Sequence, residues 1–338
     1  TPVVSSAASD VYKRQSVRRT EDKKFLTGKG KYTDDINRPG QVQAYFLRSD
    51  VAHAKIKKID IKNAQSAPGV IGVFTGDDIA ADKVGGPICG WVVPCRDGSA
   101  TKEPPHPLLA QGKVRFVGDA IAVVLAETAE QAKSGAELID VDYEELSPVV
   151  DFENAGDGAQ IHDEVPNNCY FDWELGDEKA TADALSGAKK IVKLRVRNNR
   201  LVPNAMEPRC ALAEFDNLDD SYTLHTTSQN PHLTRLVLAA FMFAIPESKL
   251  RVIAPDVGGG FGSKIYVYIE EAVCVWASKK VGRPVKWTAD RTQAFLTDCH
   301  GRDHVNDVQL GLDENNKIVG LRVDLSLIHI SEPTRPNT

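Results

Sequence analysis

The chain has 338 residues, 42% of them apolar, and a formal net charge of −6 at pH 7. This composition is typical of a globular protein, and the acidic balance excludes the broad basic surface of a nucleic-acid-binding protein. The longest apolar run, residues 236–245, has ten residues, about half of the roughly 20 that a membrane-spanning helix needs. Nothing near the N-terminus resembles a signal peptide, so we expect a cytoplasmic protein without membrane insertion.

Both ends of the sequence differ from the rest. Residues 5–15 read SSAASDVYKRQ, and residues 326–338 read SLIHISEPTRPNT. Both runs resemble translated sequencing-adapter read-through, so residues 1–15 and 326–338 are left out of the expected fold.

Residues 16–148 alternate short strands with short helices. The runs 70–74 and 121–126 are almost continuously apolar, which predicts two buried strands. Thr128 and Gln131 form a capping-box pattern that opens a helix ending near residue 138, and residues 141–143 predict a further strand. Glycines and prolines between residues 85 and 107 predict a long loop, and the polar stretch 148–158 predicts a domain boundary.

The second region, residues 149–325, becomes rich in strands from residue 188. Residues 189–200 alternate basic residues with Val and Leu, which predicts a strand with one solvated face. Residues 250–253 and 318–325 predict strands, and residues 266–280 predict a helix that is apolar on most faces and buries Cys274. None of the six cysteines stands in a CxxC pair. A disulfide between Cys89 and Cys95 stays an open alternative.

Residues 254–264, which read APDVGGGFGSK, are the most informative segment. Four glycines around Phe261 give a bare backbone that can approach a ligand closely and adopt positive φ. The spacing fits neither a dinucleotide fingerprint nor a P-loop, because Ser263 stands where each motif needs glycine. Two interpretations stay open: an anion-binding loop beside a helix start, and a tight turn that only connects strand to helix.

A second segment, residues 226–232 (TTSQNPH), comes before another predicted helix. Asn230 is a good N-cap and Pro231 suits the first helical position. Apolar residues at 233, 236, 237, 240, 241 and 244 predict a single buried face. Gln229 therefore lies just outside a helix start, where its amide can donate to an oxygen ligand; a solvated loop glutamine is the alternative.

Three further features have structural interpretations. His53, between two alanines, is interpreted as a structural histidine. Glu270 and Glu271 lie early in a helix that ends with two lysines, so charge–dipole complementarity explains them. Glu207, before Pro208, is interpreted as a surface carboxylate, with a position facing a site as the alternative.

Several segments together resemble the molybdopterin-binding large subunit of the molybdenum hydroxylases, the xanthine dehydrogenase and aldehyde oxidase superfamily. The nearest likeness is to the large chain of aerobic carbon monoxide dehydrogenases, and it covers about residues 16–325. The segments that carry it are FLTGKGKYTDDI (25–36), LRSDVAHA (47–54), RLVPNAMEPR (200–209), SQNPH (228–232), RVIAPDVGGGFGSK (251–264) and GRPVKW (282–287). The resemblance implies an α+β fold, with an α/β hammerhead domain at residues 16–148. The first, incomplete part of the molybdopterin-binding domain would follow at residues 149–325.

The resemblance also implies a site. Gln229 and Phe261 become the candidate catalytic residues: Gln229 would hydrogen-bond an oxygen ligand on molybdenum, and Phe261 would lie at the cofactor. The backbone amides of Gly259, Gly260 and Gly262 would face the same oxygen shell. The pterin dithiolene would hold the metal, so no residue of this chain is expected to bind it directly. Molybdopterin, in its plain or cytosine dinucleotide form, is the implied cofactor, with iron–sulfur clusters and FAD on partner subunits.

One departure from the family bears on the substrate. Xanthine-type relatives place an acidic residue after the lysine of the glycine loop, but Ile265 stands there. Purine oxidation is therefore disfavoured, and carbon monoxide, aldehydes and N-heterocycles stay open as small-molecule substrates. The family's general-base glutamate would lie beyond Leu325, so we expect this segment alone to be inactive. The alternative from another class is a non-catalytic remnant or an α/β anion-binding module.

Overall fold

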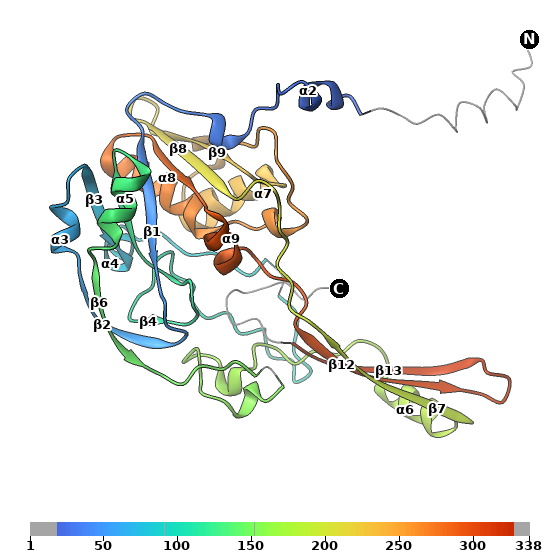
Figure 1. The fold of residues 1–338 in the computed structure, drawn as a ribbon. Helices are drawn as coiled ribbons and strands as arrows, with labels where there is room; N and C mark the ends of the chain where they lie inside the picture. Colours follow the sequence, from blue (N-terminus) through green and yellow to red (C-terminus); the bar gives the residue numbers. More distant parts are fainter. Residues whose placement is uncertain (1–18, 91, 152, 328–338) are drawn as a thin grey trace, which may run out of the picture.

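The computed structural model describes residues 19–327 except 91 and 152, and it has an α+β fold in which a compact body carries a projecting arm (Figure 1). The strands are β1 (Val42–Arg48), β2 (Ala54–Asp60), β3 (Val70–Thr75), β4 (Lys113–Val114), β5 (Ala120–Ala126), β6 (Asp140–Glu145), β7 (Lys190–Asn198), β8 (Cys210–Asp216), β9 (Ser221–Thr226), β10 (Leu250–Ile253), β11 (Val285–Thr288), β12 (His304–Leu312) and β13 (Ile318–Leu327). The α-helices are α2 (Asp22–Leu26), α3 (Lys62–Gln65), α4 (Gly76–Ala81), α5 (Ala129–Ala136), α6 (Glu178–Ser186), α7 (Pro231–Leu236), α8 (Ile269–Val281) and α9 (Arg291–Thr297).

A seven-stranded sheet in the order β10-β9-β8-β11-β1-β5-β3 forms the body. Strand β1 comes from the first region of the sequence and pairs in parallel with β11 from the second, Val42 opposite Val285. One hydrophobic core spans both regions, because Phe46 of β1 packs edge-to-face on Trp287 of β11 with ring centroids 5.8 Å apart. Helix α8 packs against β8, β9 and β11 on this core. A small sheet, β4-β2-β6, completes the first region.

The predicted strands of the first region differ in burial. Every residue of β5 is buried, as its apolar run predicts. In β3, only Val73 is buried, so the prediction of a fully buried strand is wrong there. The reason is its position at the edge of the sheet, next to β5 alone. Helix α5 carries the predicted capping box: Thr128 accepts from the Gln131 N–H.

The arm consists of the antiparallel sheet β13-β12-β7, with helix α6 packed on one side of it. Leu185 of α6 packs over Gly311 and Gly320. Cross-strand neighbours Leu194, Val308 and Val323 alternate with these glycines and therefore lie on the opposite face. Strand β7 is confirmed, but the prediction of one solvated face is wrong, because β7 is exposed on both faces over residues 190–197. None of the residues described in this structure covers the face of the arm that carries Leu194, Val308 and Val323.

The helix after Gln229 is shorter than predicted and continues differently. Asn230 caps it by accepting from the Leu233 N–H, and Pro231 occupies the first turn, both as expected. After Leu236 the chain becomes a π-helix, residues 237–242. The predicted apolar face is wrong: Leu236 and Phe241 are 39% and 52% exposed. A π-turn places more residues in each turn than an α-helix, so the 3.6-residue period no longer selects the inward face. The buried residues of this segment are instead Thr234, Leu238, Ala239 and Met242.

The described residues bear on two predictions, one about membrane insertion and one about disulfides. Within them, no helix is long and apolar enough to cross a membrane. All six cysteines lie in described positions and none of them is in a disulfide bond, so Cys89 and Cys95 are not bonded to each other. Cys274 is fully buried in α8, as predicted.

Candidate functional site

Parallel pairing brings the two informative segments together. Strands β9 and β10 are parallel neighbours, with Ile253 opposite His225. Their carboxyl ends therefore meet at the same edge of the sheet, and each strand leads directly into one of the segments. The Gln229 N–H donates to the Lys264 carbonyl at 2.8 Å, which joins the middle of the first segment to the last residue of the second. Segments separated in sequence by about 30 residues thus form one surface.

The side-chain amide of Gln229 is oriented by the glycine loop. Its Oε1 accepts the Gly262 N–H at 3.0 Å. This bond uses the acceptor end of the amide and leaves the Nε2 end to donate to a ligand. Gln229 is exposed, so a ligand can reach it. In this structure the Gly262 N–H donates to Gln229, and a direct contact of Gly262 with a ligand stays a prediction.

One of two physical reasons explains why each of the four loop positions holds a glycine. A Cβ on Gly258 would lie 2.5 Å from Glu207 Cβ, and a Cβ on Gly260 would lie 2.3 Å from Gln229 Oε1. Gly259 and Gly262 instead have φ angles of +101° and +91°, which favour glycine. Two glycines therefore permit close packing and two permit left-handed backbone.

The tip of the loop offers unused donors. Among the residues that the structure describes, no acceptor meets the N–H groups of Gly259, Gly260 and Phe261. Gly260 is nevertheless buried. Successive backbone N–H groups around left-handed residues form concavities that bind oxygen anions. Phe261 itself has φ +51° and is 75% exposed, a strained backbone and a large apolar side chain held in solvent. Strain and exposure of this kind are typical of a ligand-binding position.

Glu207 holds the base of the loop, so its interpretation as a surface carboxylate is wrong. Its side chain is 14% exposed; Oε2 accepts from the Gly258 N–H at 2.7 Å and from Lys264 Nζ at 3.1 Å. Lys264 is almost fully buried, and burial lowers its pKa against the opposing effect of Glu207. The alternative, in which Glu207 reaches the site through its loop, is the one that the structure supports.

Beneath the loop lies a buried ionic network centred on Arg209. Its guanidinium donates to Glu270 and Asp298 and lies 3.6 Å from the centre of the Tyr268 ring. Arg48 donates to the same Glu270 carboxylate at 2.7 Å. Burial raises the pKa of Glu270, but the two arginines outweigh it and lower that pKa to about 2. Tyr268 Oη donates to the Ser263 carbonyl, which ties the network to the loop.

The dipole interpretation of Glu270 and Glu271 is incomplete: both do lie in the first turn of α8, but both are also buried and bonded to other side chains. Helix α8 begins at Ile269, three residues later than predicted, and both glutamates are buried. Glu271 accepts from the Thr226 hydroxyl and from the Tyr268 N–H, so it occupies the helix start itself. Residues 265–268 separate the start of α8 from the glycine loop. The signal that could have predicted this burial was available: a helix that is apolar on most faces leaves no solvated side for charges.

The first region of the chain also supports the loop. Tyr32 forms a parallel bridge with Asp256, and the Lys31 N–H donates to the Asp256 carboxylate at 2.7 Å. His53 is buried and its Nδ1 lies 2.9 Å from the Ser147 carbonyl, in line with a structural role. Part of the segment 25–36 thus contacts the loop through Lys31 and Tyr32.

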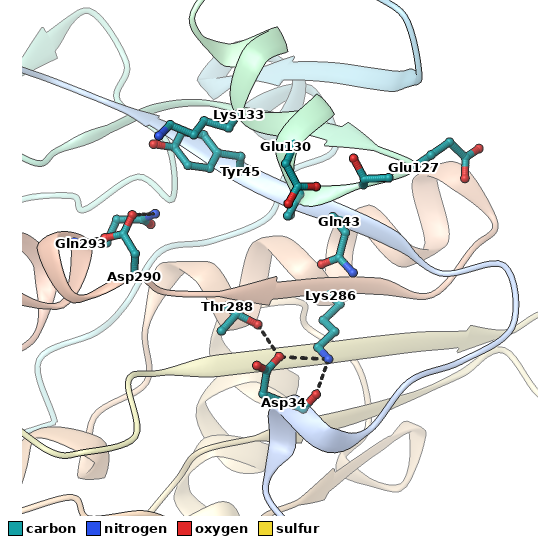
Figure 2. A pocket seen from close by; sticks show the side chains of 13 residues that line it. Asp34, Gln43, Tyr45, Glu127, Glu130, Lys133, Lys286, Thr288, Asp290 and Gln293 are labelled. Atoms are coloured by element: carbon teal, nitrogen blue, oxygen red, sulfur yellow. Dashed lines mark hydrogen bonds and ion pairs between the residues drawn. The ribbon is translucent and has the colours of Figure 1, made fainter.

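A polar hollow of about 590 Å³ lies elsewhere, where β1, α5 and β11 meet (Figure 2). Its charged groups are largely engaged within the chain. Lys286 Nζ pairs with Asp34, and Glu127 pairs with Arg283. Asp290 caps helix α9 through the Gln293 N–H. None of its lining residues belongs to the glycine loop or to the Gln229 segment. The hollow is a seam between the two regions of the sequence, and the loop remains the candidate site.

Two family models match the chain. The model described as molybdopterin cofactor-binding domain matches residues 161–329, and the model described as aldehyde oxidase and xanthine dehydrogenase, a/b hammerhead domain, matches residues 27–147. The chain belongs to the molybdenum hydroxylase family. Its fold class is confirmed: a hammerhead domain comes first and a molybdopterin cofactor-binding segment follows.

Relatives within the molybdenum hydroxylase family are similar over most of this chain. The carbon monoxide dehydrogenase large chain of Hydrogenophaga pseudoflava is 33% identical over 323 residues, which cover 91% of this chain and 39% of that protein. The nicotine 6-hydroxylase large subunit of Paenarthrobacter nicotinovorans is 34% identical over 309 residues, covering 90% and 37%. The crystal structure of quinoline 2-oxidoreductase from Pseudomonas putida 86 matches with a TM-score of 0.81 and 34% identity, covering 92% of this chain and 39% of that one. The chain therefore spans less than two fifths of the length of these relatives.

The loop fits a molybdenum cofactor in its donor chemistry. The free groups are neutral N–H donors: the Gln229 amide and the loop backbone. The carboxylates at the loop already have donors within the chain: Glu207 accepts from Gly258 and Lys264, and Asp256 accepts from Lys31 and Lys24. Oxygen atoms around a high-valent metal need such preorganised donors and not a competing acid. Within the described residues, no group of three His, Cys, Asp or Glu side chains could hold a metal ion.

Proposed function

We propose that this chain is part of the molybdenum-cofactor-binding catalytic subunit of an oxidoreductase, which hydroxylates an aldehyde or an N-heterocycle or oxidises carbon monoxide. The observation that carries the proposal is the convergence of Gln229 with the unused N–H groups of the loop tip. It occurs in a chain whose family binds molybdopterin. Iron–sulfur and FAD-binding subunits as partners, and a cytoplasmic location, belong to the same proposal.

The residues have distinct roles in this proposal. Gln229 Nε2 and the N–H groups of Gly259 and Gly260 donate hydrogen bonds to oxygen atoms of the cofactor. Gly262 orients Gln229, and the exposed ring of Phe261 would lie at the cofactor. The cofactor, as molybdopterin in its plain or cytosine dinucleotide form, supplies the two-electron redox chemistry. No residue of this chain is assigned to the metal itself.

Ile265 narrows the proposed substrate. Its side chain has no acceptor for the polar edge of a purine, so a purine is disfavoured. Nicotine and quinoline in the names of two relatives are N-heterocycles, and a third relative is named for carbon monoxide. The substrate proposal is therefore a small N-heterocycle, an aldehyde or carbon monoxide.

Metal and pterin content test the proposal directly. The chain is produced in a host that makes molybdenum cofactor, then assayed for molybdenum by elemental analysis and for pterin by fluorescence after oxidation. We expect both in the wild type and much less of both in Gln229→Ala. Glu214→Gln, a change in a pair with Arg38 away from the loop, serves as the control. A wild-type chain that carries neither molybdenum nor pterin would favour the remnant or the anion-binding module.

A further inference from the structure

The buried pair of Glu207 and Lys264 closes the glycine loop at its two ends. Gly258 begins the tight part of the loop and donates to Glu207 Oε2; Lys264 ends it and donates to the same oxygen. Lys264 Nζ also donates to the Glu207 carbonyl at 2.7 Å. In the other direction, the Glu207 N–H donates to the Gly258 carbonyl. One residue thus contacts both ends of the loop through its backbone and its side chain.

The pair also determines where Gln229 lies. The Lys264 carbonyl accepts the Gln229 N–H, and the Gly262 N–H donates to Gln229 Oε1. A shift of Lys264 therefore moves the carbonyl that accepts the Gln229 N–H, and it displaces the chain two residues after the Gly262 N–H that holds the side chain of Gln229. Stability alone gives a weak reason for such a pair, because a lysine with 1% exposure needs compensation that an apolar residue does not. Glu207 Oε1 is buried without a partner among the described groups, which adds a further cost.

We infer that Glu207 and Lys264 are positioning residues: their ion pair fixes the loop so that the Gly262 N–H meets Gln229. The inference rests on the proposed function only for the reason why the loop must be fixed; the contacts themselves are those observed in this chain. The pair touches no ligand and acts through the loop backbone.

The test is amide hydrogen exchange at Gly262 and Gly258 in the full chain, without cofactor. Glu207→Gln keeps the shape, and with its amide oxygen in the Oε2 position it can still accept from both Gly258 and Lys264, but it removes the negative charge from both hydrogen bonds and puts an NH2 group at the buried Oε1 position, which has no partner among the described groups. It also leaves Lys264 buried without its counter-charge. Lys264→Met removes the charge and leaves Glu207 bonded to Gly258. We expect Gly262 exchange to rise about tenfold or more in Glu207→Gln, a change that matches the loss of a charged hydrogen bond, and to rise less in Lys264→Met.

The double variant Glu207→Gln/Lys264→Met separates a specific pair from two independent contributions. Since it removes both charges together, its Gly262 exchange should rise by much less than the product of the two single effects. Exchange in strand β8 and the urea midpoint provide the reference for global stability. Glu214→Gln, in β8 with a less buried pair, should leave Gly262 exchange unchanged.

Three results would overturn the inference: no change at Gly262 in either single variant, a double variant equal to the product of the singles, or an equal rise across β8. Because the measurement needs no cofactor, it is independent of the proposed function. If the chain carries no molybdenum but shows the expected exchange pattern, the inference about the pair is supported and the proposed function is contradicted. If the chain carries molybdenum but the variants leave Gly262 exchange unchanged, only the inference about the pair is contradicted.

Discussion

Replacing Gly260 by alanine tests the geometry of the site at its closest contact. Neither Gly260 nor Gly258 has a left-handed φ, so alanine is allowed by the backbone at both. The new Cβ at Gly260 would lie 2.3 Å from Gln229 Oε1, against an ordinary contact of at least 3.4 Å. The amide of Gln229 must therefore retreat by about 1 Å, which breaks its bond to the Gly262 N–H at 3.0 Å.

The expected loss in the free energy of unfolding is small, about 1 kcal/mol for one hydrogen bond. Gln229 is exposed, so its side chain can swing into solvent without repacking the interior. Gly258→Ala is the matched comparison. There the Cβ meets Glu207 Cβ at 2.5 Å, an atom fixed to its own backbone, so we expect a loss of about 2–3 kcal/mol. The entropic gain of glycine to alanine is common to both variants and cancels in the comparison.

The assays are urea denaturation for stability and amide exchange for the Gly262 hydrogen bond. Gly260→Ala should expose the Gly262 amide while nearly preserving the unfolding midpoint; Gly258→Ala should lower the midpoint. Equal midpoints for the two variants, or a Gly262 amide that stays protected in Gly260→Ala, would refute the reasoning.

Three further predictions follow from buried charges and thiols. Burial lowers the pKa of His162 from 6.5 to about 3, so the unfolded chain takes up the proton first. Stability is then complete above about pH 6.5 and falls as the pH drops toward 3, and His162→Phe should flatten that part of a plot of urea midpoint against pH; an unchanged slope would count against it. Arg209→Met should cost about 3–5 kcal/mol in urea denaturation because it strands buried carboxylates, whereas Arg283→Met, in a more exposed pair, should cost less than about 1 kcal/mol; similar losses would contradict the network. A thiol reagent should modify exposed Cys169 in the native chain and spare Cys274, whose pKa burial raises; modification of Cys274 before unfolding would show that the core opens.

Local sequence patterns correctly predicted the features that depend only on residues close together in the chain, such as helix caps and short strands. The capping box at Thr128, the N-cap at Asn230 and the strand at residues 250–253 each follow from side chains a few positions apart. The π-helix after Leu236 does not, because its turn size changes which residues face inward while the apolar spacing still suggests an α-helix.

The site could be predicted only in part, since its contacts depend on strand pairing. The contact between Gln229 and Gly260 exists because β9 and β10 are parallel neighbours, and no spacing in the sequence states that pairing. Glu207 was assigned to the surface because carboxylates usually lie there, and Glu270 was explained by the helix dipole alone. Their partners, Lys264 and Arg209, lie more than 50 positions away along the chain.

The seven-stranded sheet has a consequence for how the two sequence regions can behave. Strand β1 lies between β11 and β5, so the boundary near residue 150 crosses a continuous hydrogen-bonded layer in space. A hinge opening between the two regions would break the pairing of β1 with β11, so their relative motion is limited to bending of that sheet. A chimera that exchanges residues 27–147 between relatives must therefore preserve the pairing of Val42 with Val285 and the packing of Phe46 on Trp287. The unit that folds, and that can be transplanted intact, is larger than either of the two regions that the sequence delimits.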